Sequence, residues 1–379
     1  ARPKLAVICD LREENWPSMD LVADKLLEHL EAHHPQFAAE RVCPSFHVRF
    51  GGVPVLGARR QAFNADRLLN RLHDYPRFLR SRAGAFDLFH VCDHSYANLI
   101  HELPARRVGV FCHDLDTFRS VLTPESDPRP GWFKAMARRA LGGLQKAAIV
   151  FHTTSTVRAE IERHGLVDPA RLVQAPYGIA SEFSPTPSAQ HDAAATGLLR
   201  SLGGAPFLLH VGSCIPRKRV DVLLEVFAAV RRKRAGLRLV QVGGEWTAEH
   251  RTQLARHEIE SAVLQLPRMA QAEIAALYRR AALVMMPSQS EGFGLPVVEA
   301  LASGGIVVAS DIPVFREVGG GVAVYCPFAD LPAWTDTVER LLSAPASAPA
   351  REARLNWASQ FSWAEHAQRI AAAYHRLTQ

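Results

Sequence analysis

Two glutamates and a glycine-rich turn lie within residues 287–304, PSQSEGFGLPVVEALASG. An apolar run ends at the start of this segment, and Pro296 suits the first turn of a helix, so we predict a strand, a turn and a helix. Backbone amides at such a helix start attract a phosphate. Glu291 in the turn and Glu299 in the first helical turn would flank that phosphate. Because carboxylates there must accept hydrogen bonds from hydroxyls, the pair indicates a sugar and a ribose, and therefore a nucleotide sugar.

A basic triplet follows another predicted strand, in the segment HVGSCIPRKRVDVLLEVF at 210–227. Within the loop before the next helix, Arg217 and Lys218 could neutralise a diphosphate leaving group. A plainer interpretation also stands. Glu291 would then be a solvated loop acid, Glu299 a partner of the helix dipole, and the triplet an ordinary solvated cluster.

The elements around these motifs alternate short apolar runs with stretches of helical period, which is typical of parallel sheets covered on both faces. A length of 379 residues favours two domains. We therefore predict an α/β fold of two facing, Rossmann-like, doubly wound domains, with ligands bound in a cleft beyond the carboxyl ends of the strands. The predicted boundaries are a first domain at 1–183, a linker rich in Pro, Ser and Ala at 184–197, a second domain at 198–358 and a last helix at 359–379.

Composition narrows the class of protein. Hydrophobic residues make up 48% and charged residues 22%, as in folded globular chains. No run approaches the roughly 18 apolar residues that span a bilayer, and charge comes too early for a signal peptide, so we expect a cytoplasmic protein. The six cysteines lie far apart and predict neither disulfides nor a zinc site. The net charge of +6 fits a phosphate-bearing ligand or an anionic membrane, and no motif favours nucleic acid.

The chain resembles the family 4 retaining glycosyltransferases, which have the GT-B architecture. An E-x7-E pattern is met by Glu291 and Glu299, a VG-x4-RK pattern by VGSCIPRK, and a closing FSW-x-E pattern by FSWAEHAQRI. The resemblance implies an N-terminal acceptor domain, a C-terminal donor domain and a last helix that crosses back to the first domain. It also implies that Arg217 and Lys218 hold the donor diphosphate, that Glu291 contacts the sugar and that Glu299 binds the ribose.

The resemblance extends to further residues. It places the donor beside Gly292, Phe293, Gly294 and Leu295, the nucleobase beside Leu266, Pro267, Arg268 and Met269, and a phosphate contact at Ser213, where many members have arginine. His113, in FCHDLDTFR, is the candidate that faces the donor sugar, although a structural histidine is the alternative. The loop after the first strand lacks the family's Gly-Gly and instead offers acceptor contacts at Asn15, Trp16 and Ser18, together with Asp114. Asp114 and Asp116 also spell a metal-binding D-x-D, but the two cations make a metal redundant.

The resemblance implies a retaining, metal-independent hexosyltransferase without a cofactor. It would move a hexose from a UDP- or GDP-linked donor to a hydroxyl of a glycan or lipid-linked acceptor, in bacterial cell-surface polysaccharide or glycolipid synthesis. The alternatives are a GT-B nucleotide-sugar epimerase, a sugar phosphorylase or a non-catalytic sugar-nucleotide-binding protein. The basic stretch 129–146, with Trp132, Phe133, Met136 and Ala140 on one face, indicates either a helix packed on its own sheet or a peripheral contact with the inner face of an anionic membrane.

Overall fold

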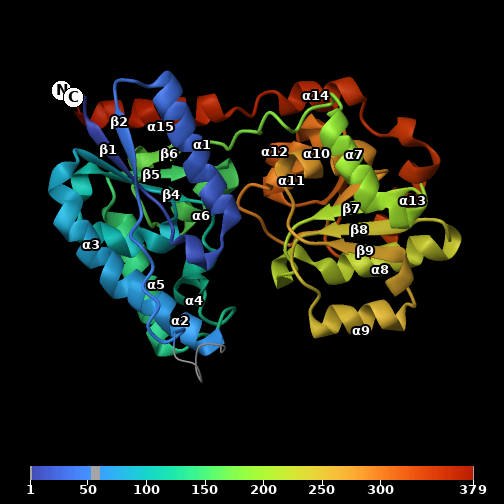
Figure 1. The fold of residues 1–379 in the computed structure, drawn as a ribbon, viewed down its shortest axis with the longest axis horizontal. Coiled ribbons are helices and arrows are strands. Elements are labelled where there is room, and N and C mark those ends of the chain that lie inside the picture. The colour runs from blue at the N-terminus through green and yellow to red at the C-terminus, as the bar shows by residue number, and fades with distance from the viewer. Residues whose placement is uncertain (1, 53–59, 379) are drawn as a thin grey trace. The chain divides into compact units, whose positions relative to one another are not determined.

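The computed structural model describes residues 2–52 and 60–378 and forms two compact α/β units (Figure 1). Unit 1 comprises Ala1–Tyr177 and Trp363–Gln379, and unit 2 comprises Gly178–Ser362. The first boundary therefore falls at residue 177, six positions before the predicted one at 183. The prediction of two doubly wound α/β units agrees with this structure.

Unit 1 is built on six parallel strands in the order β2-β1-β3-β4-β5-β6. The strands are β1 (Lys4–Ile8), β2 (Ala38–Val42), β3 (Leu88–Val91), β4 (Val108–Cys112), β5 (Ile149–His152) and β6 (Leu172–Gln174). The helices are α1 (Pro17–His33), α2 (Arg60–Leu69), α3 (Tyr75–Arg82), α4 (Arg119–Leu122), α5 (Gly131–Lys146), α6 (Ser155–Arg163) and α15 (Trp363–Thr378). The inner strands are apolar because helices cover both faces. The edge strand β2 escaped prediction because its sequence, AAERV, stays largely accessible.

The last helix, α15, is part of unit 1 and packs against α1. Its Tyr374 hydroxyl donates to the carbonyl oxygen of Phe89 on β3, at 2.8 Å. Helix α14, immediately before it, belongs to unit 2. The chain therefore passes from unit 2 to unit 1 at residue 363, and α15 packs on the sheet of unit 1.

Unit 2 repeats the architecture with the order β12-β11-β10-β7-β8-β9. Its strands are β7 (Phe207–Val211), β8 (Arg238–Val242), β9 (Val263–Leu266), β10 (Leu283–Met286), β11 (Val307–Ser310) and β12 (Val324–Cys326). Its helices are α7 (Ala189–Leu198), α8 (Val220–Lys233), α9 (Ala248–Arg256), α10 (Gln271–Arg280), α11 (Leu295–Ala302), α12 (Pro313–Gly319), α13 (Leu331–Ser343) and α14 (Arg351–Ala358). Every strand pair is parallel, so all the carboxyl ends lie along one edge.

The predicted linker at 184–197 is mostly helical, which corrects that prediction. Helix α7 packs on α10, and Arg279 Nη2 donates to the Asp192 carboxylate at 2.7 Å. Arg280 adds a 2.6 Å hydrogen bond to the Thr196 hydroxyl. The helix could not be recognised by an apolar period. Polar contacts with residues about 85 positions later in the chain hold it in place.

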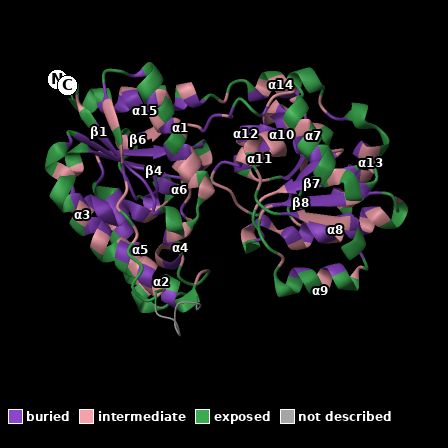
Figure 2. Ribbon diagram, viewed as in Figure 1, coloured by how far each residue is buried: buried purple, intermediate pink, exposed green. Residues whose placement is uncertain are grey.

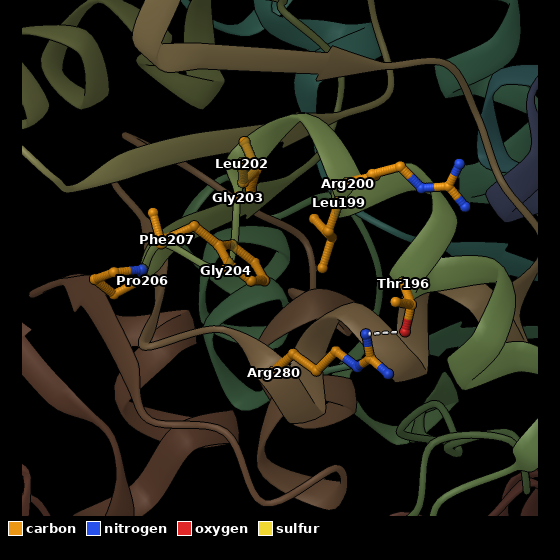
Figure 3. A pocket seen from close by; sticks show the side chains of 10 residues that line it. Thr196, Leu199, Arg200, Leu202, Gly203, Gly204, Pro206, Phe207 and Arg280 are labelled. Atoms are coloured by element: carbon orange, nitrogen blue, oxygen red, sulfur yellow. Dashed lines mark hydrogen bonds between the residues drawn. The ribbon is translucent and has the colours of Figure 1, made fainter.

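Figure 3 shows the Arg280–Thr196 bond at the edge of a hollow of about 500 Å³. Gly204 and Phe207 line the hollow where β7 begins. The basic triplet follows the other end of β7, so this hollow is separate from the predicted donor site.

Helix α5, which covers most of the basic stretch 129–146, has one face covered within unit 1 (Figure 2). Ala140 is buried together with Ala137, Leu141 and Leu144, which favours the interpretation of a helix packed within its own unit. These small and apolar side chains face the 3-10 helix η4 (His94–Glu102). Trp132, at the start of the helix, remains 59% exposed. Among the described residues, no helix is both long and apolar enough to cross a bilayer.

Candidate functional site

The two motifs of unit 2 meet where its strand order reverses. The chain builds β7, β8 and β9 in one direction, then returns to place β10 on the other side of β7. Ligands of doubly wound sheets bind at such a switch point, beyond the carboxyl ends of the strands. The basic triplet follows β7 in the short 3-10 helix η9 (Pro216–Lys218), and the glycine-rich turn follows β10. Parallel pairing therefore brings residues some 70 positions apart into one cluster.

Ion pairs join the two loops directly. Glu291 accepts from Lys218 Nζ at 2.6 Å and from Arg217 Nη1 at 2.8 Å. Arg217 Nη1 also donates to the carbonyl oxygen of Ser290 at 3.0 Å, and the Gln289 amide donates back to the Arg217 carbonyl at 2.8 Å. The Glu291 side chain is only 5% exposed. The loops are thus fixed by both backbone and side-chain bonds.

Glu291 is ionised throughout the ordinary pH range. Burial alone would raise the pKa of its carboxyl, but the charges of Lys218 and Arg217 outweigh burial and lower that pKa to about 2. The solvated-acid interpretation of Glu291 is therefore wrong, because the carboxylate is buried between two cations. The cluster holds two positive charges against one negative charge, which leaves net positive charge for an anionic ligand.

The glycine-rich turn leads into α11, as predicted. Gly294 adopts a left-handed φ of +90°, and a Cβ there would lie 2.7 Å from Phe315 Cε1, so only glycine fits without displacement. Phe293 is buried, with its ring edge-on to Phe361 at 5.7 Å between centroids. Leu295 and Pro296 open the helix. The backbone amides of Gly292 to Leu295 therefore lie at a helix start held in a set conformation.

Glu299 lies in the second turn of α11 and not in the first, which corrects its predicted position. It is buried, and Tyr278 Oη donates to its Oε2 at 3.3 Å. Burial raises the pKa of Glu299 to about 7, against smaller opposing effects of Tyr278 and Lys218. It is too far along the helix to serve mainly as a partner of the dipole. Near neutral pH this carboxyl therefore exchanges its proton readily.

This raised pKa predicts a pH-dependent stability. The folded protein holds the Glu299 proton between pH 4.5 and about 7, whereas the unfolded chain releases it near 4.5, so this contribution is complete at low pH and disappears as pH rises to about 7. We expect the free energy of unfolding of the wild type to fall between pH 5 and 8 by about 2–3 kcal/mol more than that of Glu299→Gln. Urea unfolding of both proteins at both pH values measures this difference, in which other titrating groups cancel. Equal pH slopes would contradict it.

The remaining predicted donor residues lie along the same edge of the sheet. Ser213 is just after β7, and the backbone of Gly244 after β8 approaches it so closely that a Cβ there would lie 3.0 Å from Ser213 Cα. Arg268 and Met269 follow β9, two strands away from β7. The structure thus brings Arg217, Lys218 and Glu291 into contact. Ser213, Arg268 and Met269 flank this cluster at the ends of neighbouring strands.

His210 is a polar residue near the cluster that the sequence analysis missed. It is fully buried on β7, and neither ring nitrogen has a hydrogen-bond partner among the described residues. Burial and the nearby Lys218 lower its pKa to about 3, so the ring is neutral. A Cβ on Gly212 would lie 3.3 Å from the His210 ring and 3.8 Å from Lys218 Cε, which places the ring next to the lysine stem. The signal was a lone histidine inside the apolar strand FLLHV.

In unit 1, the strand order reverses between β1 and β3, and polar residues gather at the ends of β1, β3 and β4. His113 follows β4, is buried, and its Nε2 lies 2.7 Å from the carbonyl oxygen of Cys92. The Tyr177 hydroxyl hydrogen-bonds to its Nδ1. Burial lowers the pKa of His113 below its usual value, so the ring is neutral near pH 7. Asp114 accepts from the Asp116 amide at 2.9 Å, and Asp116 pairs with Arg119.

The loop after β1 carries the predicted acceptor residues. Asn15 has a left-handed φ of 57°, Trp16 is 51% exposed, and α1 begins at Pro17. Ser18 therefore lies inside the helix, and its hydroxyl does not cap it. The chain leaves the 3-10 turn at 12–14 through the left-handed Asn15, and residues Asn15, Trp16 and Ser18 are exposed.

A buried polar group that was not predicted from the sequence, Asp10, follows β1. Asp10 is 5% exposed, and neither carboxylate oxygen has a hydrogen-bond partner among the described residues. Burial and the neighbouring Asp93 raise its pKa well above the usual value. Arg71 lies near Glu14 at 3.4 Å and over the Tyr96 ring. Asp10 and Asp93 each end an apolar strand, which was the available signal.

Comparisons with known proteins identify relatives among the glycosyltransferases. A family model described as "Glycosyl transferases group 1" matches residues 199–358, the span that holds the unit 2 cluster. A D-inositol 3-phosphate glycosyltransferase of Kineococcus radiotolerans is 32% identical, over 70% of this chain and 65% of that protein. The same-named protein of Actinosynnema mirum is 30% identical, over 78% of this chain and 73% of that protein. The chain spans only 54–65% of the length of three relatives that carry this name.

Solved structures share the fold over nearly the whole chain. Sucrose-phosphate synthase from Thermosynechococcus elongatus has a TM-score of 0.78 at 19% identity, covering 100% of this chain and 99% of that one. Anabaena Alr3699/HepE, solved in complex with UDP and glucose, has a TM-score of 0.75 at 15% identity, covering 99% and 100%. At these identities the likeness concerns the fold.

Proposed function

Because this chain belongs to the group 1 glycosyltransferases and has the GT-B fold, we propose that it transfers a hexose from a nucleotide sugar to an acceptor hydroxyl, with retention at the anomeric carbon. The observation that carries the proposal is the cluster of Arg217, Lys218 and Glu291 at the switch point of unit 2. A buried lysine and a partly exposed arginine beside a helix start suit a diphosphate. The glutamate between them suits the hydroxyls of the attached sugar.

The chemistry of transfer is chiefly electrostatic. Breaking the bond between the sugar and the diphosphate builds negative charge on the leaving group, and preorganised cations there lower the barrier. Arg217 and Lys218 supply that charge, so the reaction is proposed to need no metal. Glu291 and Glu299 accept hydrogen bonds from the sugar and the ribose. Their pKa values differ, about 2 and about 7, so only Glu291 is fully charged in every assay near neutrality.

Unit 1 is proposed to supply His113, which faces the donor sugar, and the acceptor loop that carries Asn15 and Trp16. Both ring nitrogens of the neutral His113 are engaged, by the Cys92 carbonyl and the Tyr177 hydroxyl, so a sugar hydroxyl would bond to its Nδ1 by replacing Tyr177, without adding a charge. Retention without a covalent nucleophile requires attack from the face that the diphosphate leaves, and the acceptor proton can then pass to the departing phosphate. The proposed substrates are a UDP- or GDP-linked hexose and a hydroxyl of a glycan or lipid-linked acceptor. HepE, whose complex contains UDP and glucose, supports the UDP option.

A donor screen tests the proposal directly. The purified protein is heated with UDP- and GDP-linked glucose, galactose and mannose in turn, and a donor at 100 times its dissociation constant should add about 2.7 kcal/mol of stability. The stabilising donor is then incubated with glycan acceptors, and NMR identifies the anomeric configuration of the product. An α-linked product from an α-linked donor is expected. A β-linked product would reject retention, and turnover of the donor alone would favour an epimerase or hydrolase.

A further inference from the structure

Three potential metal ligands converge within unit 1, outside the proposed donor cluster. Asp93 and His94 follow β3, and His113 follows β4, the strand that pairs with β3. One ligand atom from each residue lies within 4.8 Å of the other two. All three residues are buried, with exposed fractions of 8%, 4% and 7% for the whole residues. Two imidazoles and a carboxylate form a donor set that suits Zn²⁺ and its neighbours among the transition metals.

The hydrogen bonds of His113 fix which nitrogen could bind a metal. Its Nε2 lies 2.7 Å from the carbonyl oxygen of Cys92, which can only accept, so Nε2 carries the hydrogen. In the neutral ring, Nδ1 then carries the lone pair. Metal-binding histidines are commonly oriented in this way, by donation of the other ring N–H to a carbonyl. The Tyr177 hydroxyl now hydrogen-bonds to that Nδ1, so a metal ion would compete with its proton.

His94 and Asp93 present two acceptors to each other. The backbone N–H of His113 donates to His94 Nδ1 at 3.3 Å, so this nitrogen also carries a lone pair. The same Nδ1 lies 3.3 Å from Asp93 Oδ1. Two facing acceptors repel unless a cation lies between them. Asp93 is held in place by the amide of Ser95 at 2.7 Å and its hydroxyl at 2.8 Å, so it cannot easily turn away.

We propose that Asp93, His94 and His113 form a binding site for a transition-metal ion, with Zn²⁺ as the best fit, and that this ion inhibits the enzyme. Inhibition follows because the metal takes Nδ1 of His113 and displaces the Tyr177 hydroxyl. This second part rests on the proposed function, whereas metal binding itself does not.

Cobalt provides a readout that needs no activity. The protein is freed of metals with a chelator and titrated with Co²⁺, whose visible absorption reports nitrogen and oxygen ligation. We expect saturation at one equivalent, and displacement of the signal by Zn²⁺. His94→Gln should weaken binding at least tenfold. His73→Gln, the same change at an exposed histidine of unit 1, should bind as the wild type does.

Two results of the cobalt titration would refute the site. No cobalt signal in the wild type would refute the site, and a signal that persists in both His94→Gln and Asp93→Asn would place the metal elsewhere. Circular dichroism confirms that each variant is folded. Once a donor is known, Zn²⁺ should inhibit the wild type several-fold more than His94→Gln. A cobalt site without any transferase activity would refute the proposed function while keeping the site.

Discussion

Replacing Lys218 with methionine is expected to lower kcat by about 100- to 1000-fold, the usual cost of removing one preorganised donor at a developing charge. Methionine retains an apolar stem of similar length, so the change chiefly removes the ammonium group. That group is buried and lies 2.6 Å from Glu291, in the positive cluster that we assign to the diphosphate. Steady-state kinetics with the donor found by the screen measure the effect, with KM changing less than kcat.

Lys233→Met is the matched control. Lys233 lies in the same unit, at the end of α8, and pairs with Glu339 at 2.9 Å, but its side chain is 64% exposed. It thus loses the same charge and a comparable ion pair away from the switch point. We expect its kcat to equal that of the wild type. Should the two variants lose activity equally, or should Lys218→Met retain full turnover, the assignment of the diphosphate to this cluster would be wrong.

The cluster could be placed from sequence because parallel strands impose its geometry. Apolar runs identified β7 and β10, and any doubly wound sheet puts the loops after them on one edge. The pairing of both cations with Glu291 could not be foreseen, because it depends on side-chain directions within two loops. Glu299 falls in the second turn and not in the first because α11 begins at Leu295, directly after the left-handed Gly294, which makes Glu299 its fifth residue.

Features that depend on contacts between distant residues escaped prediction. Helix α7 has no apolar period, and its position depends on hydrogen bonds from Arg279 and Arg280 of the later helix α10. His94 belongs to η4, and its approach to His113 requires the register of β3 against β4. A polar residue after an apolar strand is common, so neither residue by itself indicated a shared site. The buried His210 is a similar case, recognisable only once the strand beside Lys218 is known.

Glu291→Gln is expected to separate nucleotide binding from turnover. The wild-type carboxylate is ionised and neutralises part of the charge of Arg217 and Lys218, so a nucleoside diphosphate must compete with it. Glutamine keeps the shape and removes the charge. We expect UDP or GDP, whichever the screen selects, to bind about tenfold more tightly, which corresponds to about 1.4 kcal/mol. Titration calorimetry at constant ionic strength measures this change.

Turnover of the same variant should fall by about 100-fold, because a neutral amide accepts hydrogen bonds from the sugar hydroxyls less strongly than a carboxylate as positive charge develops on the ring. Glu339→Gln removes the carboxylate that pairs with the exposed Lys233 and should leave both quantities unchanged. Opposite changes in nucleotide affinity and turnover are what a carboxylate that contacts both the cations and the sugar requires. Weaker binding of the diphosphate would instead mean that Glu291 mainly positions the two cations. In that case Arg217 and Lys218 would be less well ordered in the variant, and this would weaken binding more than the removal of the negative charge strengthens it.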